Sequence, residues 1–233
     1  MKRKVITALL AATMVASLAV GCGNKGGDSK SDSSKSSSSD EITIGFSQVG
    51  AESDWRTANS ESMKSTFSEK NGYKLIFDDA QQKQENQITA IRNFIQQDVD
   101  YIVLAPVTET GWDTVLKEAK DADIPVIIVD RMIDVSDDSL YTAWVGSNFK
   151  MEGQKACEWL NAYAEAKGMK EVNIAHIQGT IGASAQIGRT EGFDEAVEAH
   201  DNWTTLAQQS GEFTQAKGQE VMESMLKQYD NIN

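Results

Sequence analysis

Charged and aromatic side chains follow several short apolar runs in this sequence. The segment Gln48–Arg56 follows one run, Asp130–Arg131 follows another, and Gln209–Phe213 follows a third. Carboxylates accept hydrogen bonds from hydroxyl groups, and a guanidinium donates them in a planar fork that spans two adjacent oxygens. Indole and phenyl rings cover apolar C–H faces with few torsions to freeze. This combination is typical of a small pocket for a ring that bears hydroxyl groups.

Each of these residues also has a structural interpretation when it is taken alone. Asp130 and Arg131 could form a cap or a surface ion pair. Trp55 could belong to the core, and Arg189 could be a solvated helix residue. Their shared position at the carboxyl ends of predicted strands favours binding, because parallel α/β sheets hold their ligands beyond those ends.

Other chemistries lack the residues that they require. Gly179, Gly182 and Gly188 are not followed by the Lys-Ser/Thr pair of a phosphate-binding loop, and their spacing does not fit a dinucleotide fingerprint. His176 and His200 have no Cys or His at metal-ligand spacing. The sequence has no Gly-x-Ser-x-Gly nucleophile elbow. We therefore expect no catalytic residue, no metal site and no cofactor.

The segments around these residues alternate between strand and helix patterns. Strands are expected at residues 42–46, 73–77, 101–104, 125–129, 141–145, 172–177 and 203–207. Helices are expected at residues 54–71, 85–97, 110–122, 151–167, 188–200 and 214–228. In the second of these helices, Ile88, Ile91 and Ile95 recur at helical spacing. The alternation predicts an α/β fold with parallel sheets flanked by helices, in two blocks that meet near residue 146.

The first 40 residues have the pattern of a leader and a tether. A basic start is followed by an uncharged run over residues 5–20, which is short for a membrane-spanning helix. This is typical of a secretory signal peptide, here residues 1–21. The end of the run resembles a bacterial lipoprotein signal, so we expect lipidation at Cys22 and a disordered Ser-rich tether over residues 22–40. A plain secreted protein with an incidental cysteine is the alternative.

The composition argues against nucleic acid as a partner. The chain has 22 Lys and Arg residues against 35 Asp and Glu residues, a formal net charge of −13. Such a surface repels phosphate backbones. The other cysteine, Cys157, lies in a predicted helix and is expected to be a small buried hydrophobe.

The predicted order of elements stops on a helix. No strand follows the helix at 214–228, which leaves an apolar helix face and a sheet edge uncovered. We therefore expect an N-terminal lobe at residues 41–146. Either the second block is unusually small or the sequence is cut short. We expect C-terminal truncation, and therefore an incomplete C-terminal lobe at residues 147–233.

Several separated stretches resemble type I periplasmic sugar-binding proteins of ABC transporters. They include Gly45–Gly50, Gln81–Ile88, Val115–Ala122, Gln178–Thr180 and Gly182–Ser184. Within that family the chain is most similar to members that bind galactofuranose. The resemblance implies a two-lobed, extracytoplasmic protein, without enzymatic activity, that closes on a monosaccharide between its lobes. Members of the family also continue beyond the equivalent of Asn233 and complete both lobes.

The resemblance also implies the site residues, position by position. The main sugar contacts would be Trp55, Arg56, Asp130, Arg131, Arg189 and Phe213. Further contacts would come from Gln48, Glu52, Ser53 and Asp54, and the hinge would be Ser147 and Asn148. Asp54 stands where the family has a small residue, so the fine sugar preference stays open.

The partners implied are a monosaccharide, an ABC transporter permease and, through Cys22, the outer face of the cell membrane. The protein is expected to be a monomer. A ribose- or other pentose-binding homologue is an alternative, and so is a sugar-sensing domain for a membrane receptor, which would present the same loops. The repressor branch of this fold carries an N-terminal helix-turn-helix, where this chain has a leader and a tether.

Overall fold

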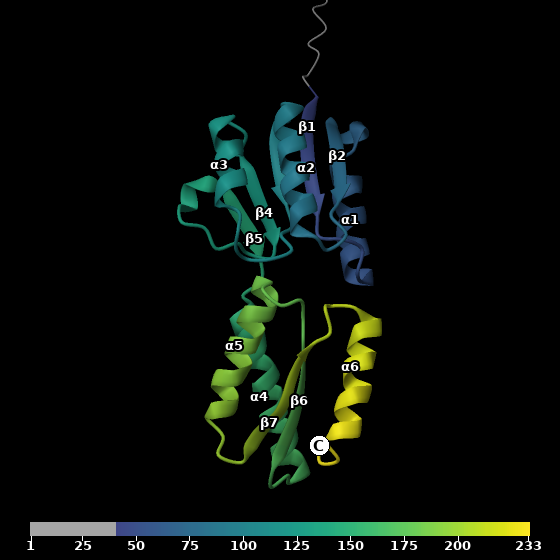
Figure 1. Cartoon of the computed structure of the whole chain (residues 1–233), viewed down its shortest axis with the longest axis vertical. Coiled ribbons are helices and arrows are strands. Elements are labelled where there is room, and N and C mark those ends of the chain that lie inside the picture. The colour runs from purple at the N-terminus through teal and green to yellow at the C-terminus, as the bar shows by residue number, and fades with distance from the viewer. Residues whose placement is uncertain (1–40) are drawn as a thin grey trace, which may run out of the picture. The chain divides into compact units, whose positions relative to one another are not determined.

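The computed structural model describes residues 41–233, whose helices and strands are shown in Figure 1. The predicted signal peptide, Cys22 and the tether lie outside these residues. The strands are β1 (Ile42–Gln48), β2 (Tyr73–Asp79), β3 (Tyr101–Leu104), β4 (Val126–Asp130), β5 (Ala143–Gly146), β6 (Val172–Gln178) and β7 (Trp203–Ser210). The α-helices are α1 (Asp54–Thr66), α2 (Gln84–Gln96), α3 (Asp113–Asp121), α4 (Phe149–Lys167), α5 (Ser184–Glu198) and α6 (Gln215–Gln228). Two short 3₁₀ helices are η1 (Glu69–Asn71) and η2 (Asp138–Leu140).

The first five strands form a parallel sheet in the order β2-β1-β3-β4-β5. Because successive side chains alternate between the faces of a strand, β2, β3 and β4 contribute side chains to two cores, one on each face of the sheet. One core joins Leu104 and Ile128 to Phe94 of α2 and Leu116 of α3. The other surrounds Phe46, with side chains from α1 packed against it. We call this sheet, with α1, α2 and α3, the N-terminal lobe.

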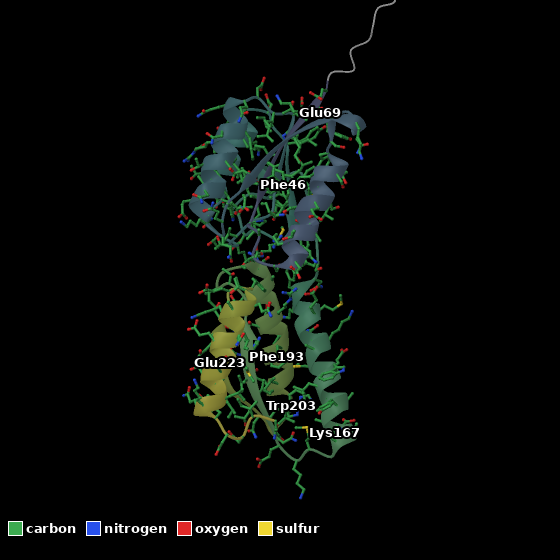
Figure 2. The ribbon with its side chains drawn as sticks, turned by 90° about the vertical axis from the view of Figure 1, so that its right-hand side faces the viewer. Phe46, Glu69, Lys167, Phe193, Trp203 and Glu223 are labelled. Carbon is green, nitrogen blue, oxygen red and sulfur yellow. The ribbon has the colours of Figure 1, made fainter. Side chains whose placement is uncertain are left out.

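The remaining strands, β6 and β7, form a second parallel pair. Figure 1 shows α6 on the opposite side of this pair from α4 and α5. The core on the α4 side contains Cys157, Val172 and Trp203, and Phe193 packs against it (Figure 2). We call β6 and β7, with α4, α5 and α6, the C-terminal lobe.

Cys157 is buried, as predicted, with only 2% of its surface exposed. Burial raises the pKa of its thiol to about 11, so the sulfur stays protonated at neutral pH. The thiol therefore behaves as part of the apolar core rather than as a nucleophile.

The predicted fold class is confirmed, since helices flank parallel strands throughout residues 41–233. The division into lobes at residues 146 and 147 stays a prediction, as does the incompleteness of the second lobe. None of the helices within residues 41–233 combines the length and the apolar character needed to cross a membrane.

Some predicted boundaries are wrong, for local physical reasons. The helix expected at residues 54–71 ends at Thr66, because the side chains of Ser68 and Asn71 bond to the carbonyl oxygens of Ser65 and Thr66 and turn the chain into η1. Gly72, with a φ of 86°, then closes η1 rather than α1.

Two other helix starts differ from the prediction. The helix expected from residue 188 begins four residues earlier, at Ser184, directly after the left-handed Gly182 (φ 85°) and the extended Ala183. The helix expected from residue 110 begins at Asp113, after the left-handed Gly111 (φ 92°). In both cases a glycine turn sets the helix start.

Candidate functional site

A cleft with a volume of about 330 Å³ lies among the loops that follow the strands. It is bounded by side chains of both lobes. The lining residues are Glu52, Ser53, Trp55, Arg56, Asp130, Arg131, Ser147, Phe149, Glu152, Ala185, Arg189 and Phe213. Since the loops after β1 and β4 leave the carboxyl edge of one parallel sheet, their side chains meet there.

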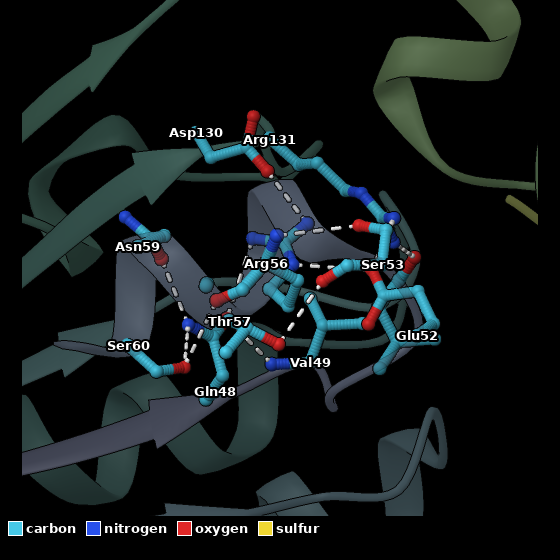
Figure 3. Close-up of polar contacts among 12 residues, drawn as sticks. Gln48, Val49, Glu52, Ser53, Arg56, Thr57, Asn59, Ser60, Asp130 and Arg131 are labelled. Carbon is cyan, nitrogen blue, oxygen red and sulfur yellow. Dashed lines mark hydrogen bonds and ion pairs between the residues drawn. The ribbon is translucent and has the colours of Figure 1, made fainter.

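Arg56 lies at the centre of the polar network on the N-terminal side (Figure 3). Ser53 caps α1 by accepting from the Arg56 backbone N–H at 3.2 Å, which fixes the helix start. The Arg56 guanidinium donates to Glu52 at 3.1 Å, to Asp130 at 2.8 Å and to Gln48 at 3.3 Å. Only 3% of this side chain is exposed, so its charge is compensated almost entirely by these groups.

Arg131 is also buried, and its charge is shared with the same network. Its Nη1 donates to the Val107 carbonyl at 3.0 Å, and its Nη2 lies 3.7 Å from Glu52 Oε1. Burial, together with the nearby Arg56 guanidinium, lowers the pKa of Arg131 to about 10. The group therefore remains protonated at neutral pH, and it stacks at 4.9 Å on Phe213 from the other lobe.

Glu52 retains one unused acceptor in this network. Its Oε1 serves both Arg56 and Arg131, but its Oε2 is buried and has no partner among residues 41–233. A buried acceptor without a donor is costly, so this oxygen weakens the local network rather than stabilising it.

The backbone of Asp130 is in the left-handed region, with a φ of 64°. This conformation is uncommon for a residue with a side chain and is tolerated best by aspartate and asparagine after glycine. It ends β4 and places the carboxylate against Arg56. Gly146 makes room for this turn, because a Cβ at that position would lie 2.2 Å from the Asp130 carbonyl oxygen.

On the C-terminal side, Arg189 and Phe213 line the cleft. Arg189 Nε donates to Glu152 at 2.8 Å, and its guanidinium carbon lies 5.0 Å from the centre of the Phe149 ring. The Phe213 ring lies directly over Gly179, where a Cβ would come within 1.9 Å of the ring. The left-handed backbone at Phe213, with a φ of 57°, turns the ring to that place.

The cleft contains three guanidinium groups and three carboxylates. The guanidinium groups belong to Arg56, Arg131 and Arg189, and the carboxylates to Glu52, Asp130 and Glu152. The formal charges therefore cancel, while donors and acceptors remain plentiful. Such a set suits an uncharged molecule with many hydroxyls better than a phosphate or a carboxylate ligand.

Most of the predicted contact residues lie at the cleft, but two do not. Gln48 is fully buried behind Arg56 and also bonds to Asn59 and Ser60, so it supports the network from behind. Asp54 is exposed as the first residue of α1 and does not line the cleft.

The two hinge candidates, Ser147 and Asn148, form the short segment between β5 and α4. Ser147 lines the cleft, whereas Asn148 caps α4 by accepting from the Met151 backbone N–H at 3.0 Å. The helix cap therefore explains an asparagine at position 148 even if this segment is not a hinge.

Sequence reasoning missed Phe149, Glu152 and Ala185 as lining residues. The Asn148 cap, with Glu152 one turn further on, was a signal for the start of α4 at the cleft edge. No local pattern indicated that Glu152 would meet Arg189, because that contact depends on how α4 and α5 cross.

Within residues 41–233, no group of three or more His, Cys, Asp or Glu side chains is placed to hold a metal ion. Burial lowers the pKa of His176, so its ring is largely neutral at neutral pH.

The sequence matches the periplasmic binding protein domain over residues 44–233. The galactofuranose-binding protein YtfQ of Escherichia coli (strain K12) is 50% identical over 190 residues, which are 82% of this chain and 58% of that protein. The ribose import binding protein RbsB of Bacillus subtilis (strain 168) is more distant, at 29% identity over 70% of this chain and 50% of its own length.

Two solved structures are similar in both fold and sequence. The binding protein of the arabinose ABC transporter from Shewanella sp. ANA-3, bound to α- and β-L-arabinofuranose, has a TM-score of 0.75 and 52% identity. A protein from Mycobacterium smegmatis in complex with β-D-fucofuranose has a TM-score of 0.78 and 47% identity. Each match covers 82% of this chain, but the chain spans only 61% and 62% of those chains.

Proposed function

Because the chain belongs to the periplasmic binding protein family, we propose that it captures an uncharged monosaccharide for an ABC importer. The observation that supports this most directly is the charge-balanced cleft between the two lobes. Its three arginines and three carboxylates offer donors and acceptors without net charge, and Trp55, Phe149 and Phe213 supply ring faces.

We further propose that the ligand is bound in its furanose form, with galactofuranose or a related sugar as the natural ligand. The support is that three similar proteins are described with galactofuranose, arabinofuranose or fucofuranose. A ribose- or pentose-binding role is the alternative, and it has the weaker support of more distant relatives.

Calorimetric titration with a small panel of sugars tests this proposal. Methyl β-D-galactofuranoside, D-galactose, L-arabinose and D-ribose are compared with methyl β-D-galactopyranoside, which fixes the six-membered ring. Binding of the furanoside but not of the pyranoside is expected. Binding of none of these sugars would contradict the proposed function, and preferred binding of ribose would favour the alternative.

The cellular setting is part of the same proposal. We place the protein outside the cytoplasm, in keeping with its family, and expect lipidation at Cys22 to hold it at the outer face of the membrane. It would act as a monomer, without catalysis, and hand its sugar to a permease. Metabolic labelling with a fatty-acid analogue tests the anchor, because Cys22→Ser should abolish the label.

A sensor for a membrane receptor would use the same cleft, so sugar binding alone does not separate it from a transport protein. Co-purification from membranes with the sugar present distinguishes the two. An importer permease is the expected partner, and recovery of a receptor instead would contradict a transport role.

A further inference from the structure

One ion pair of the cleft is made entirely by the C-terminal lobe. Arg189 Nε donates to Glu152 Oε2 at 2.8 Å, and the two side chains are 43% and 37% exposed. An isolated ion pair at such a position contributes little to folding stability. Its effect on the direction of the guanidinium can nevertheless be large, because a charge-assisted hydrogen bond has a narrow geometry.

The helices α4 and α5 are packed unusually closely at this ion pair. A Cβ at Gly153 would lie 2.2 Å from the Arg189 carbonyl oxygen, and a Cβ at Gly192 would lie 2.1 Å from that of Lys150. The two glycines therefore allow the backbones to touch where α4 begins. This contact brings Glu152, in the first turn of α4, within reach of Arg189.

The surroundings hold the Arg189 guanidinium on two sides and leave its end free. Glu152 holds Nε, and the Phe149 ring covers one face of the group at 5.0 Å. Among residues 41–233, Nη1 and Nη2 of Arg189 make no hydrogen bond, although the side chain lines the cleft. The end of the fork is thus available for two oxygens of a ligand.

We propose that Glu152 is a positioning residue that orients Arg189 and cancels its charge, so that the cleft selects uncharged sugars over sugar acids. This inference rests on the proposed function and assigns a task to one residue of the same site. Without the Glu152 charge, the cleft would have three guanidinium groups against two carboxylates, and an anionic ligand would be favoured.

The test uses the substitution Glu152→Gln, which keeps the shape of the side chain and removes its charge. Glu195→Gln is the matched control, since Glu195 also forms an ion pair between α5 and α4, with Lys150 at 2.8 Å, but does not line the cleft. D-Galactose and D-galacturonate, which differ by a carboxylate, are titrated at pH 7 into both variants and the unsubstituted protein.

For Glu152→Gln we expect galactose affinity to fall about tenfold and the galacturonate-to-galactose affinity ratio to rise by at least about tenfold. Glu195→Gln should change both by less than about twofold. In an Arg189→Leu background, Glu152→Gln should have no further effect on galactose binding, because the two residues act as one unit. An unchanged ratio, or additive losses in that background, would overturn the proposal.

A second measurement does not depend on sugar binding. In a ¹⁵N-labelled sample, the Nε–H resonance of Arg189 should be visible and protected from exchange, and Glu152→Gln should shift or broaden it while Glu195→Gln leaves it in place. If no sugar binds, the proposed function fails and this resonance alone decides the role of Glu152. A resonance that is the same in all three proteins would refute that role.

Discussion

Asp78 is a single side chain whose burial should make folding stability depend on pH. Its Oδ1 is buried at the end of β2 and has no hydrogen-bond partner among residues 41–233. Burial, and then the neighbouring Asp79, raise the pKa of Asp78 above its usual value. The unfolded chain therefore releases this proton at lower pH than the folded one, so the ionised carboxylate opposes folding at neutral pH.

We expect Asp78→Asn to increase the free energy of unfolding at pH 7. The gain should shrink as the pH falls through the raised pKa and towards the ordinary carboxyl value, where Asp78 is neutral in both states. Urea unfolding at a series of pH values measures this, with the exposed Asp201→Asn as a control. An equal gain at every pH would mean that charge is not the cause.

Arg56 should be far less replaceable than an arginine on the surface. Its fork meets Glu52, Gln48 and Asp130 at once, and a lysine offers no such planar set of donors. We expect Arg56→Lys to lower the free energy of unfolding by about 1–3 kcal/mol, because buried acceptors lose their donors. Arg92→Lys, which alters the exposed pair with Glu118, should have a much smaller effect in the same urea titrations, because solvent screens that pair.

The position of a site residue could be predicted from the sequence only where it follows directly from a neighbouring strand. Asp130 and Arg131 follow a buried strand, so a position at the sheet edge was predictable from the apolar run before them. Gln48 was not placed correctly, because β1 extends two residues further than its apolar run and turns this side chain inward. Glu152 depends on a contact between helices, which local sequence does not encode.

Among the helices, the close contact of α4 with α5 should be the most sensitive to added volume. A methyl group at Gly153 meets the backbone of Arg189 at 2.2 Å, and backbone atoms cannot turn aside as a side chain can. We expect Gly153→Ala to destabilise the protein by about 1–3 kcal/mol and to weaken sugar binding by displacing Arg189.

Gly218→Ala in α6 is the matched control, since a Cβ there has no neighbour within 4 Å. That substitution should stabilise the protein by up to about 1 kcal/mol through helix propensity. The melting temperatures of both variants are compared by thermal unfolding. An unchanged melting temperature for Gly153→Ala would show that α4 and α5 can move apart at little cost.

The helices and strands were predictable in type and order because their periodicity is strong. Ile88, Ile91 and Ile95 mark α2 whatever the tertiary structure. Their ends were less predictable, since the end of α1 is set by Ser68 and Asn71 side chains that bond to the backbone. Propensity favours the helix there, and local hydrogen bonds override it.

For the whole molecule, the balance of charge in the cleft contrasts with the net charge of −13 on the chain. Salt screens the interaction between a charged ligand and the charges of the protein, but an uncharged ligand has no net charge on which such screening can act. We expect sugar affinity to change by less than about twofold between low and high salt, over about 0.05–0.5 M. Titrations across that range measure it, and a steep salt dependence would indicate an anionic ligand.

The alternation of strands and helices was enough to predict the parallel α/β architecture, because few topologies satisfy it. The residues that meet at the cleft could not be predicted from that alternation alone. Contacts such as Met132 N–H to Ser184 Oγ at 2.8 Å, and Arg131 over Phe213, join segments more than 50 residues apart. Only the assembled sheets bring such segments together.

The left-handed turn that ends β4 also constrains how homologous clefts can diverge. At position 130 the backbone admits glycine, asparagine and aspartate at low cost, and bulkier or branched residues would be strained. Glycine removes the acceptor of Arg56 Nη2, and asparagine removes one of the two carboxylates that pair with the Arg56 guanidinium. Conformation and electrostatics together favour aspartate at position 130, so we expect new ligand preferences in homologous clefts to arise by substitution of the neighbouring residues.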